Sequence, residues 1–166
     1  MHVAFVHRRG FGQFSALAEH LAANGHDVSL VCETVDRRLP SVRDIKHRAE
    51  PGPRSDTQMA KHLGIPDHHV RIGHRVAETL EAMVRHDQKP DIVIGHIGWG
   101  SMMFAKDVLP QVPAIGYCEF FYRADGADVG FAPDDLPDAD TRKRLRLRNI
   151  AQLISLEAID GGISPT

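Results

Sequence analysis

The chain has 166 residues, with 20 Lys and Arg against 22 Asp and Glu and a formal net charge of −2. This is the length of one domain, which buries about two thirds of the surface of its unfolded chain. With a net charge so close to zero, the chain has no overall positive electrostatic field that would attract nucleic acid. The longest apolar runs are far shorter than a membrane-spanning helix. The N-terminal residues do not resemble a signal segment, and Cys32 and Cys118 are typical of buried thiols. We therefore expect a cytoplasmic protein without a disulfide.

The first residues predict a strand, a turn, a helix and a second strand. Residues 3–7 form an apolar run, and a glycine-containing turn follows it. Between residues 14 and 22 the apolar side chains recur at helical spacing, and Asn24-Gly25 ends that helix. Residues 27–32 then give another strand. This order predicts a βαβ unit with a right-handed crossover.

The middle of the chain gives a weaker signal before it becomes clear again. Residues 33–66 are basic and interrupted by prolines, and the only element expected there is a strand through 45–49. A long helix follows, with apolar side chains on one face between Val70 and Val84. Beyond the next strand, Ser101 is expected to cap a helix that continues to Leu109.

The last third continues the alternation of strands and helices. Residues 91–95 and 114–118 are apolar runs of strand length, and a loop covers residues 119–137. A single helix is expected from about residue 138 to residue 158, and a strand begins after it near the terminus. The pattern predicts an α/β fold, a Rossmann-like doubly wound, mainly parallel sheet with helices on both faces. The strand at the terminus favours a chain that is part of something longer.

The most informative stretch is residues 91–100, in which a buried strand ends in His96 and glycines flank the only tryptophan, Trp99. In open α/β sheets, ligands bind at the carboxyl ends of the strands, where His96 is placed. Gly98 and Gly100 carry no side chain and let the backbone approach a ligand. The alternatives are a structural histidine beside a turn and a tryptophan that fills the core.

The first strand–helix turn, residues 8–14, contains Gly10 and Gly12 and leads into a helix whose free N–H groups attract anions. As a dinucleotide-binding fingerprint it is incomplete, because Ser15 occupies the third glycine position. Glu33, at the end of the second strand, has the position of a ribose-binding carboxylate. The alternative is a tight turn that merely needs glycine.

The loop of residues 119–131 combines aromatic and charged side chains. This mixture is suited to binding a sugar, because aromatic faces pack against the C–H groups of the sugar and carboxylates accept hydrogen bonds from its hydroxyls. A core-anchoring aromatic cluster with a solvated acidic rim is the alternative. The basic run of residues 142–148 is expected to be mostly a solvated helix surface, because its five cations cannot all face one ligand.

The eleven histidines are scattered along the chain, apart from His68-His69 and His74. No spacing of a metal site occurs among them, so we expect no metal and mostly solvent-facing imidazoles. A nucleophilic hydrolase is equally disfavoured, because the sequence around Ser101 lacks the second glycine of a nucleophile elbow.

Over residues 1–166 the chain resembles the N-terminal domain of family 4 glycosyltransferases, most specifically from residue 90 onwards. The blocks that carry the resemblance are PDIVIGHIGWG, KDVLP, GYCEFFYRADGADVGFAPDDLP, RLRLRN and GGISPT. They are similar to a subgroup with HPGWGE, a KDVFP-like stretch, and EFYY followed by GADVGFDPEFP. The first half is generic to the fold. Ile97 stands where proline is typical and Ser101 where glutamate is typical, and both departures bear on acceptor preference.

The resemblance implies one half of a GT-B architecture, in which two Rossmann-like domains face each other across a cleft. Residues 1–166 would be a single N-terminal, acceptor-side domain, and the C-terminal domain that mainly binds the nucleotide-sugar would lie outside this chain. The whole enzyme would transfer a sugar to a sugar or glycan acceptor with retention, without a cofactor or a metal. The isolated chain is expected to be inactive. Peripheral membrane association of the parent enzyme and homodimerisation of the chain are compatible with this interpretation.

Carried over position by position, the resemblance makes His96 the catalytic candidate, near the transferred sugar. The turn at Gly10 and Gly12 would face the donor diphosphate and the acceptor. The other substrate-binding candidates are Gly98, Trp99, Gly100, Glu119, Tyr122, Arg123 and Asp125.

Three other functions remain open at this point. A nucleotide-sugar epimerase shares the two-domain architecture. A stand-alone nucleotide- or NAD-binding regulatory domain has the support of Gly10, Gly12 and Glu33. A non-catalytic scaffold would bind a partner through the helix of residues 142–148.

Overall fold

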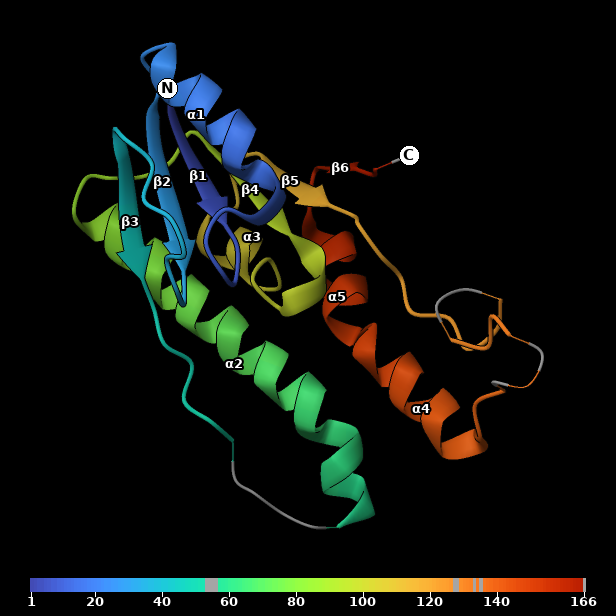
Figure 1. Cartoon of the computed structure of the whole chain (residues 1–166). Coiled ribbons are helices and arrows are strands. Elements are labelled where there is room, and N and C mark those ends of the chain that lie inside the picture. The colour runs from blue at the N-terminus through green and yellow to red at the C-terminus, as the bar shows by residue number, and fades with distance from the viewer. Residues whose placement is uncertain (53–56, 127–128, 133, 135, 166) are drawn as a thin grey trace.

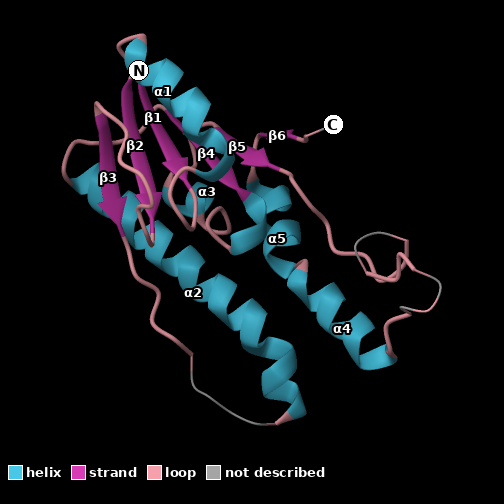
Figure 2. Ribbon diagram, viewed as in Figure 1, coloured by secondary structure: helices cyan, strands magenta, loops and turns pink. Residues whose placement is uncertain are grey.

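The computed structural model describes residues 1–52, 57–126, 129–132, 134 and 136–165, and its strands form one parallel sheet of six strands. The strand order is β3-β2-β1-β4-β5-β6 (Figures 1 and 2). The strands are β1 (His2–Val6), β2 (Asp27–Cys32), β3 (Val42–Lys46), β4 (Ile92–His96), β5 (Ala114–Tyr117) and β6 (Gly161–Ile163). β1 is buried throughout, as expected for a central parallel strand covered on both faces.

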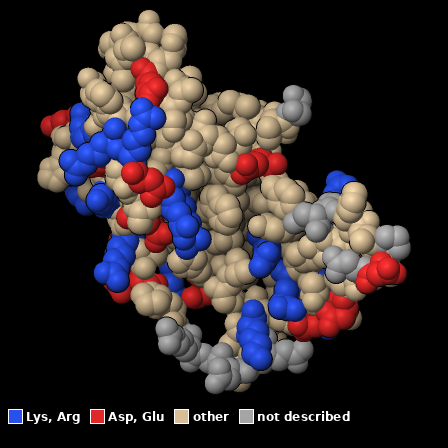
Figure 3. Space-filling view, viewed as in Figure 1, with Lys and Arg blue, Asp and Glu red and all other residues tan. Residues whose placement is uncertain are grey.

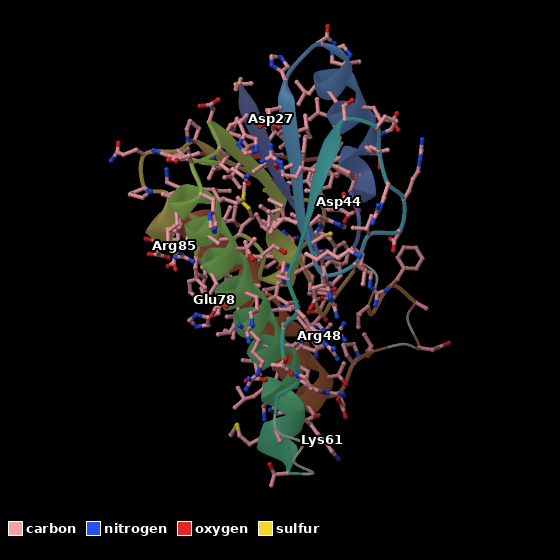
Figure 4. The ribbon with its side chains drawn as sticks, turned by 90° about the vertical axis from the view of Figure 1, so that its left-hand side faces the viewer. Asp27, Asp44, Arg48, Lys61, Glu78 and Arg85 are labelled. Atoms are coloured by element: carbon pink, nitrogen blue, oxygen red, sulfur yellow. The ribbon has the colours of Figure 1, made fainter. Side chains whose placement is uncertain are left out.

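Helices cover both faces of the sheet, which confirms the predicted doubly wound α/β fold. The helices are α1 (Ser15–Ala23), α2 (Gln58–Arg85), α3 (Ala105–Val108), α4 (Ala139–Arg148) and α5 (Ile150–Ala158). Figure 4 shows the sheet between α1, in blue, and α2, in green. Because side chains alternate along a strand, Phe5 packs in one core with Ala18 of α1, whereas Val6 packs in the other with Leu80 of α2.

The strand order places the topological switch between β1 and β4, from which the chain winds outward in both directions. At such a point the loops after the two strands diverge and leave a crevice at the carboxyl edge of the sheet. His7 directly follows β1, and His96 is the last residue of β4. The fold therefore brings these two residues together across a sequence separation of almost ninety positions.

The weak signal before residue 66 concealed the start of the longest helix. α2 begins at Gln58 and contains Pro66, which removes one internal hydrogen bond and costs about 3 kcal/mol in a helix interior. The helix nevertheless continues, because Thr57 caps it by accepting a hydrogen bond from the Ala60 N–H at 3.2 Å. Its apolar face, including Ile72, is buried in the core. Tertiary packing thus outweighs the proline.

Three smaller expectations about the elements are also corrected. β3 lies over Val42–Lys46 rather than 45–49. Ser101 does not cap α3, because the chain forms a 3-10 turn at Ile97–Trp99 and α3 begins only at Ala105. The single helix expected after residue 138 is divided at Asn149 into α4 and α5.

Only three of the eleven histidines are exposed and five are buried, so the expectation that most face solvent is wrong. The buried histidines are His2, His7, His47, His69 and His96, each no more than 9 % exposed. The two cysteines are free, and burial raises the pKa of the Cys32 thiol to about 11. A thiol with so high a pKa stays protonated and is unreactive at neutral pH.

The surface agrees with the near-neutral charge of the sequence. Lysine, arginine, aspartate and glutamate are interspersed over the face shown in Figure 3. None of the helices that the structure describes combines the length and the hydrophobicity needed to cross a membrane.

Candidate functional site

A cavity of about 600 Å³ lies at the carboxyl edge of the sheet, beside the turn that follows β1. The turn, the segment after β4 and the segment after β5 all contribute to its walls. The lining residues are His7, Arg8, Arg9, Gly12, Gln13, Trp99 and Glu119. A smaller cavity of about 270 Å³ shares Trp99 and Glu119 with it and is lined by His96 as well. The switch point of the sheet therefore carries two adjoining cavities of the size of a sugar or a larger ligand.

His96 is fixed in orientation by hydrogen bonds at both ring nitrogens. Its Nδ1 accepts from the Gly98 N–H at 2.9 Å, and its Nε2 lies 3.0 Å from Glu119 Oε2. Because Nδ1 accepts, the neutral ring carries its proton on Nε2 and donates it to the carboxylate. The imidazole is only 3 % exposed, so it has one fixed direction for its donor.

Glu119 connects His96 to the first turn. Its second oxygen, Oε1, accepts a hydrogen bond from Gln13 Nε2 at 2.7 Å, while Oε2 accepts from His96. The Glu119 side chain is 40 % exposed, so the carboxylate also faces solvent in the cavity. The chain Gln13–Glu119–His96 joins the segments after β1, β5 and β4 at one point.

Aromatic rings surround the imidazole of His96. Trp99 stacks on it with ring centroids 5.5 Å apart and an interplanar angle of 27°. His7 and Tyr117 lie at 6.0 and 5.9 Å. Burial among these rings lowers the pKa of His96, against the opposing hydrogen bond of Glu119. At neutral pH the group is therefore a neutral imidazole that donates one hydrogen bond, not a cation.

The glycines of the first turn both adopt the left-handed conformation that glycine favours. Gly10 has φ +51° and Gly12 has φ +50°. A Cβ on Gly12 would lie 2.7 Å from His7 Cε1, so this glycine makes room for the imidazole beside the cavity. The Gly10 N–H is already bonded to the carbonyl of Thr34 at 2.7 Å. Of the two, only Gly12 lines the cavity.

In the turn after β4, Gly98, Trp99 and Gly100 have three different roles. Gly98 uses its N–H to hold His96 and lines the smaller cavity. Trp99 is half-buried and lines the large cavity as well as the small one, rather than filling the core. Gly100 has φ +86° and lies against the carbonyl oxygen of His69 on α2, so its part is structural.

The candidates of the 119–131 loop separate into two places. Glu119 and Tyr122 line the cavity of His96. Arg123 and Asp125 line a different hollow beside α4, of about 710 Å³, where Asp125 pairs with Arg142 at 2.8 Å. The predicted loop is thus only partly at the site. Ala127 and Asp128, which belong to the motif of the resemblance, lie outside the described residues.

Sequence reasoning missed several residues that the fold brings to the site. Gln13 follows an unremarkable turn pattern, and only its bond to Glu119, 106 residues away, makes it significant. Gln152 of α5 is 2 % exposed and lines the smaller cavity. Its Nε2 donates to the Phe120 carbonyl at 2.6 Å. No local signal marks a residue whose partners are far away in the chain.

Two other features bear on cofactors. Glu33, the candidate for a ribose hydroxyl, accepts a hydrogen bond from Arg8 Nε at 3.1 Å. Within the part of the chain that the structure describes, no three His, Cys, Asp or Glu side chains converge in a way that could hold a metal ion.

The buried histidines predict acid sensitivity. Burial lowers the pKa values of His47, His68, His69 and His96, that of His69 to about 4. In the unfolded chain a histidine has a pKa near 6.5. Below this pH the unfolded state therefore binds protons that the native state does not bind, because the buried imidazoles have lower pKa values. We expect the free energy of unfolding to fall between about pH 6.5 and 4, with His69 alone contributing about 3 kcal/mol.

Urea denaturation at a series of pH values measures this effect. A variant with His69→Phe keeps a ring of similar size without a titrating group and should show a shallower pH dependence. Constant stability between pH 7 and 5 would refute the neutral, buried state of these imidazoles.

The comparisons with known proteins concern the family and the fold of the chain. Residues 24–166 match the model of the glycosyl transferase family 4 group. No curated protein matches the chain. Among solved structures, a variant of Os79 from O. sativa in complex with UDP is similar, with a TM-score of 0.57 and 13% sequence identity. A UDP-glucosyltransferase from Polygonum tinctorium has a TM-score of 0.52 and 11% identity.

These structural similarities concern the fold. The alignments cover 99% of this chain in both cases, but 47% of the O. sativa chain and 45% of the Polygonum chain. The chain thus spans about half the length of these structures. Since the family model covers most of the chain, the protein belongs to the glycosyl transferase family 4 group.

Proposed function

We propose that the chain is the acceptor-side half of a retaining glycosyltransferase that transfers a sugar from a nucleotide-sugar to a sugar or glycan acceptor. The family membership supports the reaction class. The observation that carries the placement of the site is the hydrogen-bonded chain Gln13–Glu119–His96 at the switch point of the sheet. The membership in the narrower subgroup with HPGWGE-like motifs belongs to the same proposal.

The residues of the site have the chemistry that a sugar requires. Trp99 and Tyr122 offer aromatic faces to C–H groups, and the half-exposed carboxylate of Glu119 accepts hydrogen bonds from hydroxyls. His96 donates from Nε2 in a direction set by its bond to Gly98. A hydroxyl that enters between His96 and Glu119 would receive this hydrogen bond and give one to the carboxylate. His96 would thereby orient the reacting end of the acceptor.

The donor would be held mainly by a second domain outside this chain, in a GT-B arrangement. The O. sativa neighbour is described in complex with UDP, which fits a nucleotide-sugar donor for the family fold. We expect neither a cofactor nor a metal to be required. A cytoplasmic location, peripheral association of the parent enzyme with a membrane and homodimerisation of the chain are parts of the same proposal. Exposed apolar side chains such as Phe121 and Leu153 are available for such contacts.

The alternatives have less support. In a stand-alone NAD-binding domain, Glu33 would bind a ribose hydroxyl, but here it pairs with Arg8, and Gly10 uses its N–H within the turn. A nucleotide-sugar epimerase would share the architecture, but the family model that matches is one of glycosyl transferases.

Assays of the chain by itself test the proposal that it binds the acceptor and that another domain binds the donor. We expect no turnover of UDP-glucose or other nucleotide-sugars, because in this proposal the donor-binding groups would lie outside the chain. Fluorescence of Trp99, the only tryptophan, should respond to sugars in the acceptor cavity and not to NAD. Turnover by the isolated chain at an ordinary enzymatic rate, about 1 s⁻¹ or faster, would refute the proposal, and a tight response to NAD would favour the regulatory domain.

A further inference from the structure

A third cavity, of about 370 Å³, adjoins the site on the side of α2 and α4. It shares Arg8 and Trp99 with the large cavity and Tyr122 with the cavity of His96. Its remaining walls come from α2, with Gly64, Ile65, His68 and His69, and from α4, with Arg148. A ligand at His96 could therefore extend into this space without leaving the protein surface.

The charges in this cavity are predominantly positive. Arg8 and Arg148 both line it, and the only carboxylate that pairs with either among the described residues is Glu33, which contacts Arg8 Nε at 3.1 Å. The Arg148 guanidinium lies 5.2 Å from the centroid of the Tyr122 ring, which holds it in place without neutralising it. One full positive charge is thus left uncompensated beside the cavity.

His69 supplies an independent indication of a ligand. It lines the cavity and is 6 % exposed, yet its Nδ1 has no hydrogen-bond partner among the described residues, and neither has Nε2 of His68. Buried polar atoms in proteins are nearly always satisfied. Burial, together with the positive charges of Arg8 and Arg148, keeps the pKa of His69 low and its ring neutral. A neutral imidazole has an N–H to offer to an anionic oxygen.

We propose that this cavity binds an anionic group of the acceptor, a phosphate or a carboxylate, between Arg8, Arg148 and His69. Guanidinium groups present N–H donors in a planar fork that matches such oxyanions, and charge-assisted bonds of this kind are the strongest in proteins. This inference rests on the proposed function and narrows it. The acceptor would be an acidic sugar or a sugar phosphate, with its reacting hydroxyl near His96 and its charge near Arg148.

Titration of the chain with charged and neutral sugars, followed by Trp99 fluorescence and calorimetry, tests the proposal. Glucose 6-phosphate or glucuronate should bind at least about tenfold more tightly than glucose. Arg148→Gln should remove this advantage and leave the weak binding of glucose unchanged, whereas Arg148→Lys should keep part of it. Arg146→Gln is the matched control, since Arg146 is exposed on the same helix and does not line the cavity.

The outcomes separate this proposal from the one on which it rests. If glucose binds as tightly as glucose 6-phosphate, the anionic subsite is refuted, while the acceptor role of the chain stands. If no sugar of either kind binds, the acceptor role itself fails. Tighter binding of UDP than of sugar phosphates, dependent on Arg148, would assign the cavity to the donor and overturn the inference.

A last comparison identifies where the anion comes from. Vesicles of phosphatidic acid and phosphatidylcholine replace the sugar phosphate. If the chain binds to these vesicles and the binding depends on Arg148 but not on Arg146, the subsite is supported and its anionic group is that of a lipid headgroup. Binding of soluble glucose 6-phosphate alone supports it with a free sugar phosphate.

Discussion

Replacing Gly100 by alanine is expected to lower the free energy of unfolding by more than about 3 kcal/mol. Gly100 has φ +86°, a conformation that costs a residue with a side chain about 1–2 kcal/mol. A Cβ there would also overlap the carbonyl oxygen of His69, which belongs to the backbone of α2 and cannot move alone. The turn after β4 would therefore be pushed away from α2.

Gly25 provides a matched control for this substitution. Its φ of +79° is nearly the same, but a Cβ there meets nothing within 4 Å. Gly25→Ala should lower the free energy of unfolding only by the cost of placing a side chain at positive φ, about 1–2 kcal/mol. Urea denaturation of both variants measures the difference. Equal losses of stability would show that Gly100 is needed for its backbone angle alone and that the close approach of the turn to α2 is not tight.

The core of the fold was predictable because it depends on local patterns. The runs that became β1, β2, β4 and β5 are predominantly apolar without a regular polar alternation, as is typical of strands buried on both faces. Their alternation with amphipathic helices allows few topologies besides a doubly wound sheet. The position of His96 at the end of a central strand also follows, because parallel strands present their carboxyl ends at one edge. The start of the last helix near residue 138 was also predictable, and the structure shows Asp138 as its cap, with Oδ1 accepting a hydrogen bond from the Thr141 N–H at 2.7 Å.

The rest depends on contacts between distant parts of the chain. Pro66 and the basic residues before it hid the start of α2, whose stability comes from packing on the sheet and not from propensity. The burial of His69 depends on Gly100 approaching α2 so closely. Likewise, Gln13 and Glu119 acquire their roles only when the turn after β1 meets the segment after β5. A single sequence contains no signal for such pairs.

Replacing His96 by alanine should lower the rate of sugar transfer by about two to three orders of magnitude in an enzyme that contains this chain and a donor-binding domain. The substitution removes the Nε2 donor, frees the Glu119 carboxylate from its partner and exposes one face of Trp99. Glu119→Gln is a milder change, because the amide keeps the shape of the side chain but loses its charge. We expect a smaller loss of rate there, since His96 keeps its bond to Gly98.

The most direct measurement is therefore the transfer rate of the His96→Ala enzyme at saturating acceptor, beside a His86→Ala enzyme. His86 is an exposed histidine that follows α2 and lines neither of the two cavities of the site. Circular dichroism establishes that both variants are folded. We predict a loss of about two orders of magnitude or more for His96→Ala and an unchanged rate for His86→Ala. A folded His96→Ala enzyme with the rate of the unsubstituted protein would contradict the assignment of the switch-point cavity as the place where the acceptor reacts.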